Sequence, residues 1–185
     1  MSFSLLSNRD EFGYSLKFDT ASAAGLVKPN TIETSYDNPL GKGDRYESIV
    51  VSSAGGWHRV TGLQYLVGGS TTENVGVFPR DALGCSITFD FGTARHINEV
   101  RIYLTNQISM GSWQWVGSDD NTTWSDPISG VGELKQSDNT TPVTFPMAVG
   151  YVAYYRYYKI EGVSGYINDY YFREFEFKID AGSTT

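Results

Sequence analysis

The segment that decides the fold reads Ser86-Ile87-Thr88-Phe89-Asp90-Phe91-Gly92 and continues, after three residues, as His96-Ile97-Asn98-Glu99-Val100-Arg101-Ile102-Tyr103-Leu104. Apolar and polar residues alternate in both runs, so that Ile87, Phe89 and Phe91 share one side of the first run. A period of two residues is typical of a β-strand with one buried face. The segment therefore predicts two consecutive amphipathic strands.

The break between the two runs contains the expected turn. Gly92 is predicted to end the first strand, and Thr93 and Ala94 to form the turn that leads into the second. Each strand is expected to bury one face in the core of the domain.

A hairpin with a polar tip is predicted next along the chain. Trp113 to Gly117 supplies a strand, Ser118 to Thr123 supplies the tip, and Trp124 begins the return. Asp119 and Asp120 are interpreted as residues that make this turn.

Two further strands are expected near the C-terminus, at Tyr154–Glu161 and Phe172–Ile179. In the second strand Phe175 and its apolar neighbours alternate with Glu174 and Glu176, which predicts one apolar and one polar face. We expect the two strands to be adjacent in the core. Fainter alternation suggests shorter strands at Tyr14–Asp19, Ser48–Ser52 and Gly62–Val67.

The whole chain favours an all-β fold. No window of twelve residues keeps apolar residues at helical spacing, and 20 glycines and 6 prolines stand among short apolar runs. Short strands joined by polar loops, with no helix between them, predict an antiparallel β-sandwich. The 185 residues suit one domain overall.

Composition excludes several function classes. The net charge is −7 and no basic block is present, so a nucleic-acid partner is not expected. No stretch suits a membrane span, since Val143 to Tyr155 is interrupted by Pro146 and Gly150. The lone Cys85 has no partner for an internal disulfide and is interpreted as a small buried residue before a strand.

Catalytic chemistry is not predicted either. His58 and His96 are the only imidazoles, and neither a nucleophile elbow nor a zinc ligand set accompanies them. Gly41-Lys42-Gly43-Asp44 lacks the features of a phosphate-binding loop and reads as a surface turn. We expect a protein that is not an enzyme, without catalytic residues.

Aromatic residues provide the candidate ligand site. Eight tyrosines lie between Tyr151 and Tyr171, and two readings of them remain open. In the first reading their rings pack across a sheet. In the second reading the loop members form a platform for a sugar or a partner. The candidate binding residues are Tyr166, Asn168, Tyr170 and Tyr171, together with the loop residues Trp57, His58 and Arg59, although Trp57 could equally anchor the core.

The order of these elements resembles the discoidin family, also called coagulation-factor type C domains, within the galactose-binding-like jelly rolls. The resemblance rests on three strings. The paired strands around Asp90-Phe91-Gly92 form the first, and the hairpin from Gly117 to Trp124, with Asn121 at the family's glycine, is the second. The third is Tyr155–Ile160 followed by Arg173–Phe177.

The resemblance implies a jelly roll that binds through loops at one end, often to glycans. It covers residues 61–181, while residues 1–60 form an N-terminal arm and first strands and residues 182–185 form a tail. It also implies a calcium ligand in a Leu-x-Asp-Gly turn, but Leu66-Val67-Gly68-Gly69 has Gly68 at the acidic position. Glu174 or Glu176, with backbone carbonyls, could hold a hard cation, but we predict no metal and no cofactor.

Two hypotheses for function follow. The first is a non-catalytic subunit of a phage or similar virion, with no secretory signal visible in Met1–Asp10. It would be assembled in the host cytoplasm with other virion subunits as a homo-oligomer or larger assembly, and would present loops to a cell-surface glycan. Its N-terminal residues, to about residue 20, would pack on a neighbouring subunit. The second hypothesis is a carbohydrate-binding module of a secreted, extracellular glycan-active enzyme.

Overall fold

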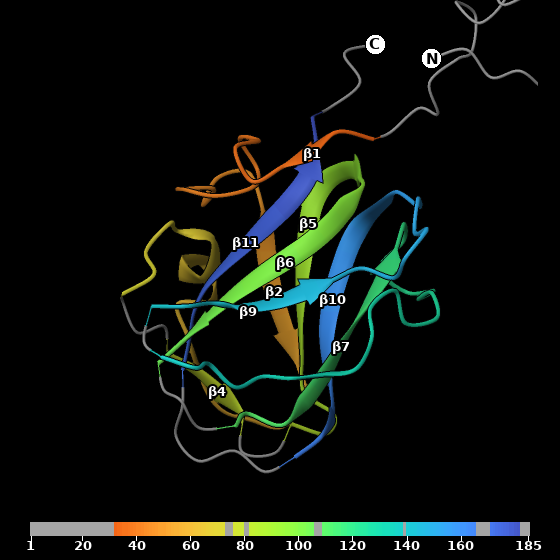
Figure 1. Ribbon diagram of the computed structural model, residues 1–185. Helices are drawn as coiled ribbons and strands as arrows, with labels where there is room; N and C mark the ends of the chain where they lie inside the picture. Colours follow the sequence, from red (N-terminus) through yellow and green to blue (C-terminus); the bar gives the residue numbers. More distant parts are fainter. Residues whose placement is uncertain are drawn as a thin grey trace, which may run out of the picture. The chain divides into compact units, whose positions relative to one another are not determined.

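The computed structural model describes residues 32–72, 76–79, 82–105, 109–138, 140–165 and 171–181, with the backbone alone for 58–61 and 76–79. These residues belong to one compact unit that begins at Ile32. Figure 1 shows this unit as two β-sheets that face each other. No helix among the described residues is long and apolar enough to cross a membrane.

Both sheets are antiparallel throughout the pairs that their strands make. The first sheet has the strand order β1 (Thr34–Ser35), β11 (Phe172–Asp180), β6 (Ile97–Leu104) and β9 (Val143–Pro146). The second has the order β2 (Val50–Ala54), β5 (Ser86–Arg95), β10 (Tyr155–Ser164), β7 (Ser112–Ser118) and β8 (Gly132–Glu133). Such a pair of sheets confirms the predicted antiparallel β-sandwich.

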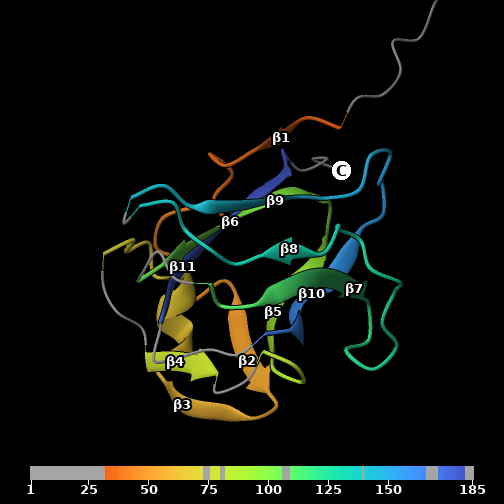
Figure 2. The same cartoon turned by 60° about the horizontal axis from the view of Figure 1, so that its bottom comes forward.

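A separate hairpin and one short helix complete the described part. Strands β3 (Trp57–Thr61) and β4 (Gly76–Pro79) pair with each other, and the 3₁₀-helix η2 (Leu63–Val67) follows β3. Figure 2 shows this hairpin at the end of the sandwich opposite β1.

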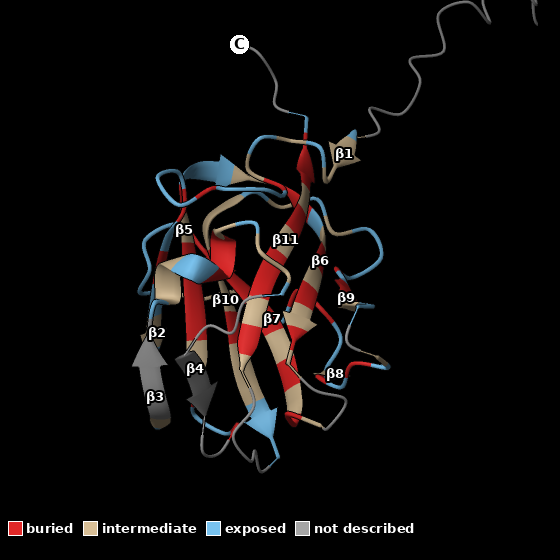
Figure 3. Ribbon diagram, turned by 90° about the vertical axis from the view of Figure 1, so that its left-hand side faces the viewer, coloured by how far each residue is buried: buried red, intermediate tan, exposed pale blue. Residues whose placement is uncertain are grey.

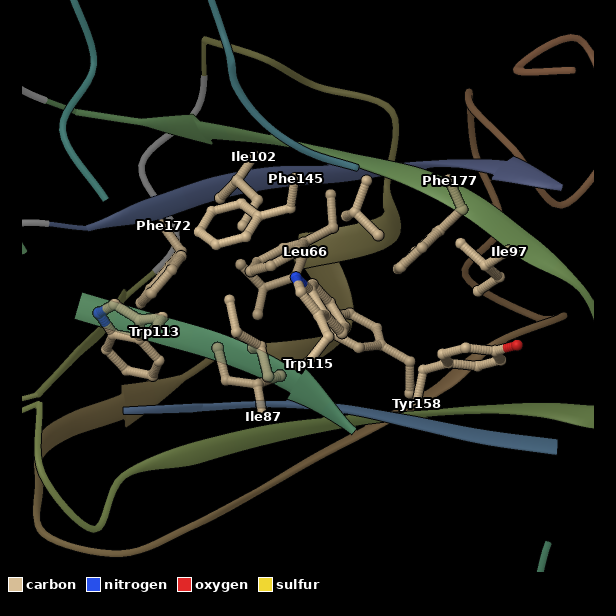
Figure 4. Packing of buried hydrophobic residues seen from close by; sticks show 14 of the residues in the cluster. Leu66, Ile87, Ile97, Ile102, Trp113, Trp115, Phe145, Tyr158, Phe172 and Phe177 are labelled. Carbon is tan, nitrogen blue, oxygen red and sulfur yellow. The ribbon is translucent and has the colours of Figure 1, made fainter. Parts of the chain in front are cut away.

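Aromatic side chains fill the space between the sheets. Trp115 of β7 and Phe89 of β5 come from one sheet and lie 5.9 Å apart between ring centroids, while Phe175 and Phe177 come from β11 of the other. Phe89 contacts these two rings at 4.9 and 5.1 Å, and Trp115 contacts them edge-on at 6.1 and 6.3 Å. Figure 4 shows Trp115 and Phe177 between the two layers. Offset and edge-to-face geometry is the arrangement that aromatic rings prefer.

The two strands predicted at Ser86–Phe91 and His96–Leu104 are confirmed, with one correction to the segment between them. Ile87, Phe89 and Phe91 are buried as predicted. However, the first strand does not end at Gly92, and residues 93 and 94 are part of β5 rather than a turn. Gly92 has a φ of 72°, and its N–H donates to Asp90 Oδ1, so the strand bends there and continues to Arg95.

The prediction that Tyr154–Glu161 and Phe172–Ile179 are adjacent is wrong. Strand β10 lies between β5 and β7, and β11 lies between β1 and β6 in the opposite sheet. Alternation indicates which face of a strand is buried but not which strand lies beside it, and consecutive strands of a sandwich often change sheets.

Two other predicted strands have different outcomes. Ser48–Ser52 overlaps β2, but Gly62–Val67 is the helix η2 rather than a strand. Gly62, with a φ of 68°, begins the helix, and its carbonyl accepts from the Tyr65 N–H. Leu66 and Val67 are buried from this helix, which explains the apolar run. The predicted strand Tyr14–Asp19 lies outside the described residues.

Cys85 is buried directly before β5, as predicted.

Candidate functional site

The structure does not place Trp57 in an exposed loop. It is the first residue of β3, and its ring contacts Trp113 at 6.4 Å and Phe172 edge-on at 6.3 Å. Its Nε1 donates to the Ala54 carbonyl. Trp57 is half-buried and packs against the core, so the structure supports the alternative reading as a core anchor.

The other predicted site residues are only partly described. The backbone of His58 and Arg59 lies in β3, where it pairs with β4, rather than in a loop. Tyr171 is half-buried before β11, and its N–H donates to Thr105 Oγ1. Tyr166, Asn168 and Tyr170, like the side chains of His58 and Arg59, lie outside the described residues.

A surface hollow of about 420 Å³ lies where β7 ends, at a place that the sequence did not indicate as a site. Its walls combine two aromatic rings with hydroxyl and carboxylate groups. The lining residues are Gly117, Ser118, Asp119, Asp120, Thr123, Trp124, Ser125 and Tyr155.

Tyr155 forms one wall because it lies against a glycine. A Cβ added to Gly117 would lie 2.0 Å from Cδ2 of the Tyr155 ring. Tyr155 also contacts the buried Tyr158 edge-on at 6.0 Å. Any side chain at residue 117 would therefore displace the ring that lines the hollow.

Trp124 contributes the second ring. The Lys159 ammonium lies 4.1 Å from the centroid of the Trp124 ring, and the same ammonium pairs with Glu161 Oε2 at 3.1 Å. A cation over an indole face is an attractive contact. Lys159, which is itself paired with Glu161, thus holds Trp124 in position beside the hollow.

The floor of the hollow is a turn organised by Asp120. Its Oδ1 accepts from the backbone N–H groups of Thr122 and Thr123 at 2.8 and 2.7 Å, and its Oδ2 accepts from Thr123 Oγ1. Asn121 has a φ of 59° and is the one non-glycine residue with positive φ in the described ranges. This conformation explains a glycine at the matching position of the resembled hairpin.

Asp119 has fewer partners than Asp120. Its Oδ1 accepts from the Arg156 backbone N–H at 3.4 Å, while the Arg156 guanidinium makes a two-bond pair with Asp90 at 2.8 Å for each bond. That pair lowers the pKa of Asp90 and ties β10 to β5 beside the hollow. Of the two carboxylates in the lining, Asp119 therefore makes fewer hydrogen bonds within the protein.

His96 has a structural role. Its ring is buried and stacks on Tyr151 at 5.5 Å, and its Nε2 lies 3.0 Å from the Tyr151 carbonyl.

In the part of the chain that the structure describes, no group of three or more His, Cys, Asp and Glu side chains is arranged to hold a metal.

Solved structures similar to this chain include carbohydrate-binding modules. The family 32 module of NanJ from C. perfringens, in complex with galactose, has a TM-score of 0.52 and 13% identity and covers 75% of this chain and 98% of its own. The family 32 module of AlyQ, in complex with 4,5-unsaturated mannuronic acid, has a TM-score of 0.51 and 16% identity, with 69% and 92% covered. The C-terminal domain of a Bacteroides fragilis chitobiase has a TM-score of 0.51 and 14% identity, and the match covers 71% of this chain and 93% of that domain.

The domain has the galactose-binding-like, discoidin-type jelly-roll fold. This confirms the resemblance drawn from the sequence. No protein-family model and no curated protein matches the chain. The low identities to the solved structures mean that the jelly roll, and not its ligand, is what the chain shares with them.

Some tyrosines of the tyrosine-rich segment pack in the core, and another lies at the surface. Tyr158 is fully buried in the core of the jelly roll, and its hydroxyl donates to the Arg95 carbonyl at 2.7 Å. Tyr151 stacks on His96, whereas Tyr155 lines the hollow. Packing accounts for Tyr151 and Tyr158, while Tyr155 stands at a surface that can receive a ligand.

The sequence also missed a buried ion pair. Glu174 was expected on the polar face of its strand, but it is completely buried, and its Oε1 pairs with Arg45 Nη2. In Figure 3 most of β11 is coloured as buried. The segment from Leu40 to Arg45 lies along one edge of β11, where the Phe177 N–H donates to the Gly41 carbonyl and Arg45 Nη2 donates to the Phe175 carbonyl, and the Gly69 N–H after η2 donates to Glu174. The outward face of a strand is exposed only if nothing else packs on it.

Acid should weaken the turn that forms the floor of the hollow. Hydrogen bonds from Thr123 and Thr122 hold the pKa of Asp120 well below its ordinary value of 3.8. A depressed carboxyl pKa stabilises the fold above the unfolded pKa, and this stabilisation is lost as the pH falls toward the folded pKa. We expect the melting temperature of the Asp120→Asn variant to change less than that of the wild type between about pH 5 and pH 3.

A second turn with the same Asp-Asn-Thr-Thr sequence provides a parallel test of this explanation. Asp138 accepts hydrogen bonds from Thr140 and Thr141 in the same manner, which also lowers its pKa. Asp138→Asn should flatten the acid response similarly, whereas an unchanged response in both variants would show that neither turn contributes to acid sensitivity.

Proposed function

We propose that this jelly-roll domain is a non-catalytic carbohydrate-binding module and that the hollow between Trp124 and Tyr155 holds a neutral sugar. The observation that carries the proposal is the lining of the hollow, which combines two aromatic rings with carboxylate and hydroxyl groups. The similar modules of NanJ and AlyQ, both in complex with sugars, support the same function class.

The chemistry of the hollow suits a pyranose. The C–H face of a sugar ring is apolar and packs on an aromatic face, while the hydroxyls at its edge need hydrogen-bond partners. Trp124 and Tyr155 supply the aromatic surface, and Asp119 is placed to accept from sugar hydroxyls. Hydrogen bonds to a charged acceptor are stronger than those between neutral groups.

The charge of the lining favours a neutral sugar over a uronic acid. Asp119 and Asp120 are both in the lining, and none of the lining residues is Lys, Arg or His. The nearby cations are already engaged, since Arg156 pairs with Asp90 and Lys159 with Glu161. A sugar carboxylate would meet two like charges with no compensating cation.

The comparisons favour the module hypothesis over the virion hypothesis. Two of the similar solved structures reported above are carbohydrate-binding modules and the third is a domain of a chitobiase, and none of the three is described as a virion protein. A non-catalytic role and an extracellular setting accord with those neighbours. The proposed N-terminal arm and its packing on a neighbouring subunit fall outside the described residues and remain a proposal.

Titration calorimetry with simple sugars tests the proposal. We expect saturable binding of galactose or N-acetylgalactosamine with a Kd of about 1 mM, and weaker binding of mannuronate. Absence of heat with every neutral hexose would contradict a sugar-binding role.

The Tyr166→Ala variant locates the site in the same experiment. If it loses affinity while Trp124→Ala retains it, the ligand is bound at the residues predicted from the sequence, between β10 and β11 along the chain, and not in the hollow. If Tyr166→Ala binds as the wild type does, the hollow remains the site.

A further inference from the structure

Arg45 is a cation that the fold buries completely. Its side chain has an exposure of 0%, and each nitrogen of its guanidinium donates to oxygen atoms. Nε donates to the Gly43 carbonyl at 2.9 Å, and Nη1 donates to the carbonyls of Gly41 and Leu40 at 2.7 and 3.4 Å. Nη2 donates to the Phe175 carbonyl at 2.8 Å and to Glu174 Oε1. The five N–H groups of a guanidinium are thereby all used.

The atoms around this guanidinium are those that a hard metal cation prefers. Four backbone carbonyls and one carboxylate oxygen surround the guanidinium, and calcium is bound by oxygens of these kinds. We call these five oxygens, from Leu40, Gly41, Gly43, Glu174 and Phe175, the oxygen cradle.

The turn that the resemblance associates with calcium lies beside the cradle. The Gly69 N–H donates to Glu174 Oε2 at 2.9 Å, and the Arg45 N–H donates to the Val67 carbonyl. Gly68 supplies no carboxylate in this turn, so Glu174 is the one carboxylate in the cradle. A close approach fixes the arrangement, because a Cβ on Gly69 would lie 2.6 Å from the Gly43 carbonyl carbon.

Charge and space both exclude calcium while Arg45 is in place. The guanidinium fills the centre of the cradle and its single positive charge balances the single negative charge of Glu174. With Arg45 in place, a divalent ion would find no unoccupied oxygen in the cradle and no carboxylate charge that is not already balanced. Burial raises the pKa of the Glu174 carboxyl, while the Arg45 guanidinium and the Gly69 N–H act against that rise by stabilising the carboxylate.

We propose that Arg45 is a tethered cation that replaces a structural metal ion in the oxygen cradle, and that the fold of this chain is therefore independent of calcium. Arg45 joins three segments of chain, since the cradle comes from the loop before Arg45 and from β11 and abuts the turn after η2. In this jelly roll the cation is part of the polypeptide.

Thermal unfolding of the full chain in chelator and in calcium tests the proposal. The wild type should melt within about 1 °C of the same temperature in EDTA and in calcium chloride. Arg45→Ala leaves Glu174 and the carbonyls buried without a partner, so its melting temperature should fall by about 10 °C. Calcium chloride at about 5 mM should restore several degrees of this loss, because the emptied cradle accepts the ion, whereas sodium chloride of equal ionic strength should restore none.

Arg156→Ala is the matched control, because it removes an arginine whose side chain is 44% exposed and pairs with Asp90. Its loss should be much smaller and insensitive to calcium. If Arg45→Ala does not fold unaided, recovery of its β-sheet circular dichroism with calcium alone is the expected result.

Two results would overturn the proposal. A wild-type melting temperature that falls in EDTA and recovers with calcium would show that the fold uses a metal despite Arg45. An Arg45→Ala variant that gains nothing from calcium would show that the oxygens do not form a cation site.

Discussion

Replacing Trp115 with alanine is expected to lower the free energy of unfolding by about 3–5 kcal/mol, the largest loss we expect from a single core substitution. Trp115 is fully buried and contacts Phe89 in its own sheet and Phe175 and Phe177 in the other. Its removal leaves a cavity at the centre of the sandwich. Equilibrium unfolding in denaturant, followed by tryptophan fluorescence, measures the loss.

Trp115→Phe separates packing from hydrogen bonding at this position. The indole Nε1 of Trp115 is buried and has no hydrogen-bond partner among the described residues. Phenylalanine keeps most of the aromatic contact and removes this unpaired donor, so its cost should be about 1 kcal/mol. A loss as large as that of Trp115→Ala would contradict the packing account.

Replacing Trp124 with alanine is expected to weaken sugar binding at least about tenfold while changing stability by less than about 1 kcal/mol. Trp124 lines the hollow at the surface and takes no part in the buried core. Calorimetry with galactose gives the affinity, and thermal unfolding gives the stability. Trp57 provides the contrast, since Trp57→Ala should destabilise the fold through its contacts with Trp113 and Phe172.

Asp138→Asn completes the comparison because it alters an Asp-Asn-Thr-Thr turn that is not part of the hollow. Its affinity for galactose should equal that of the wild type. A similar loss of affinity in Asp138→Asn and Trp124→Ala would mean that binding responds to general stability and not to the hollow.

The fold was predictable wherever one face of a strand is buried and the other is not. Alternation located β5 and β6, because Ile87, Phe89, Val100 and Ile102 all face the core. Alternation failed for the placement of β10 and β11, because the sheet that a strand joins depends on contacts distant in sequence. It also failed for Glu174, because the Arg45 guanidinium and the Gly69 N–H, which are distant in the sequence, cover this side chain.

The candidate site was harder to predict than the fold. Polar turn residues are common, and Asp120 and Thr123 read as an ordinary turn until Trp124 and Tyr155, 31 positions apart in the sequence, are seen to line one hollow. Nothing in the sequence pattern indicated that Arg45 is buried, since a single arginine in a loop is usually solvated. The positive φ of Asn121 agrees with the resemblance, because the matching position of the family is a glycine.

The most direct test of the sugar-binding account is nuclear magnetic resonance of the tryptophan indoles during a galactose titration. The chain has 4 tryptophans and therefore four indole N–H signals, of which Trp113 and Trp115 are buried in the core. The account predicts that galactose shifts the Trp124 signal in a saturable manner and leaves the Trp57, Trp113 and Trp115 signals in place. No shift of any indole, or a shift confined to Trp57, would contradict it.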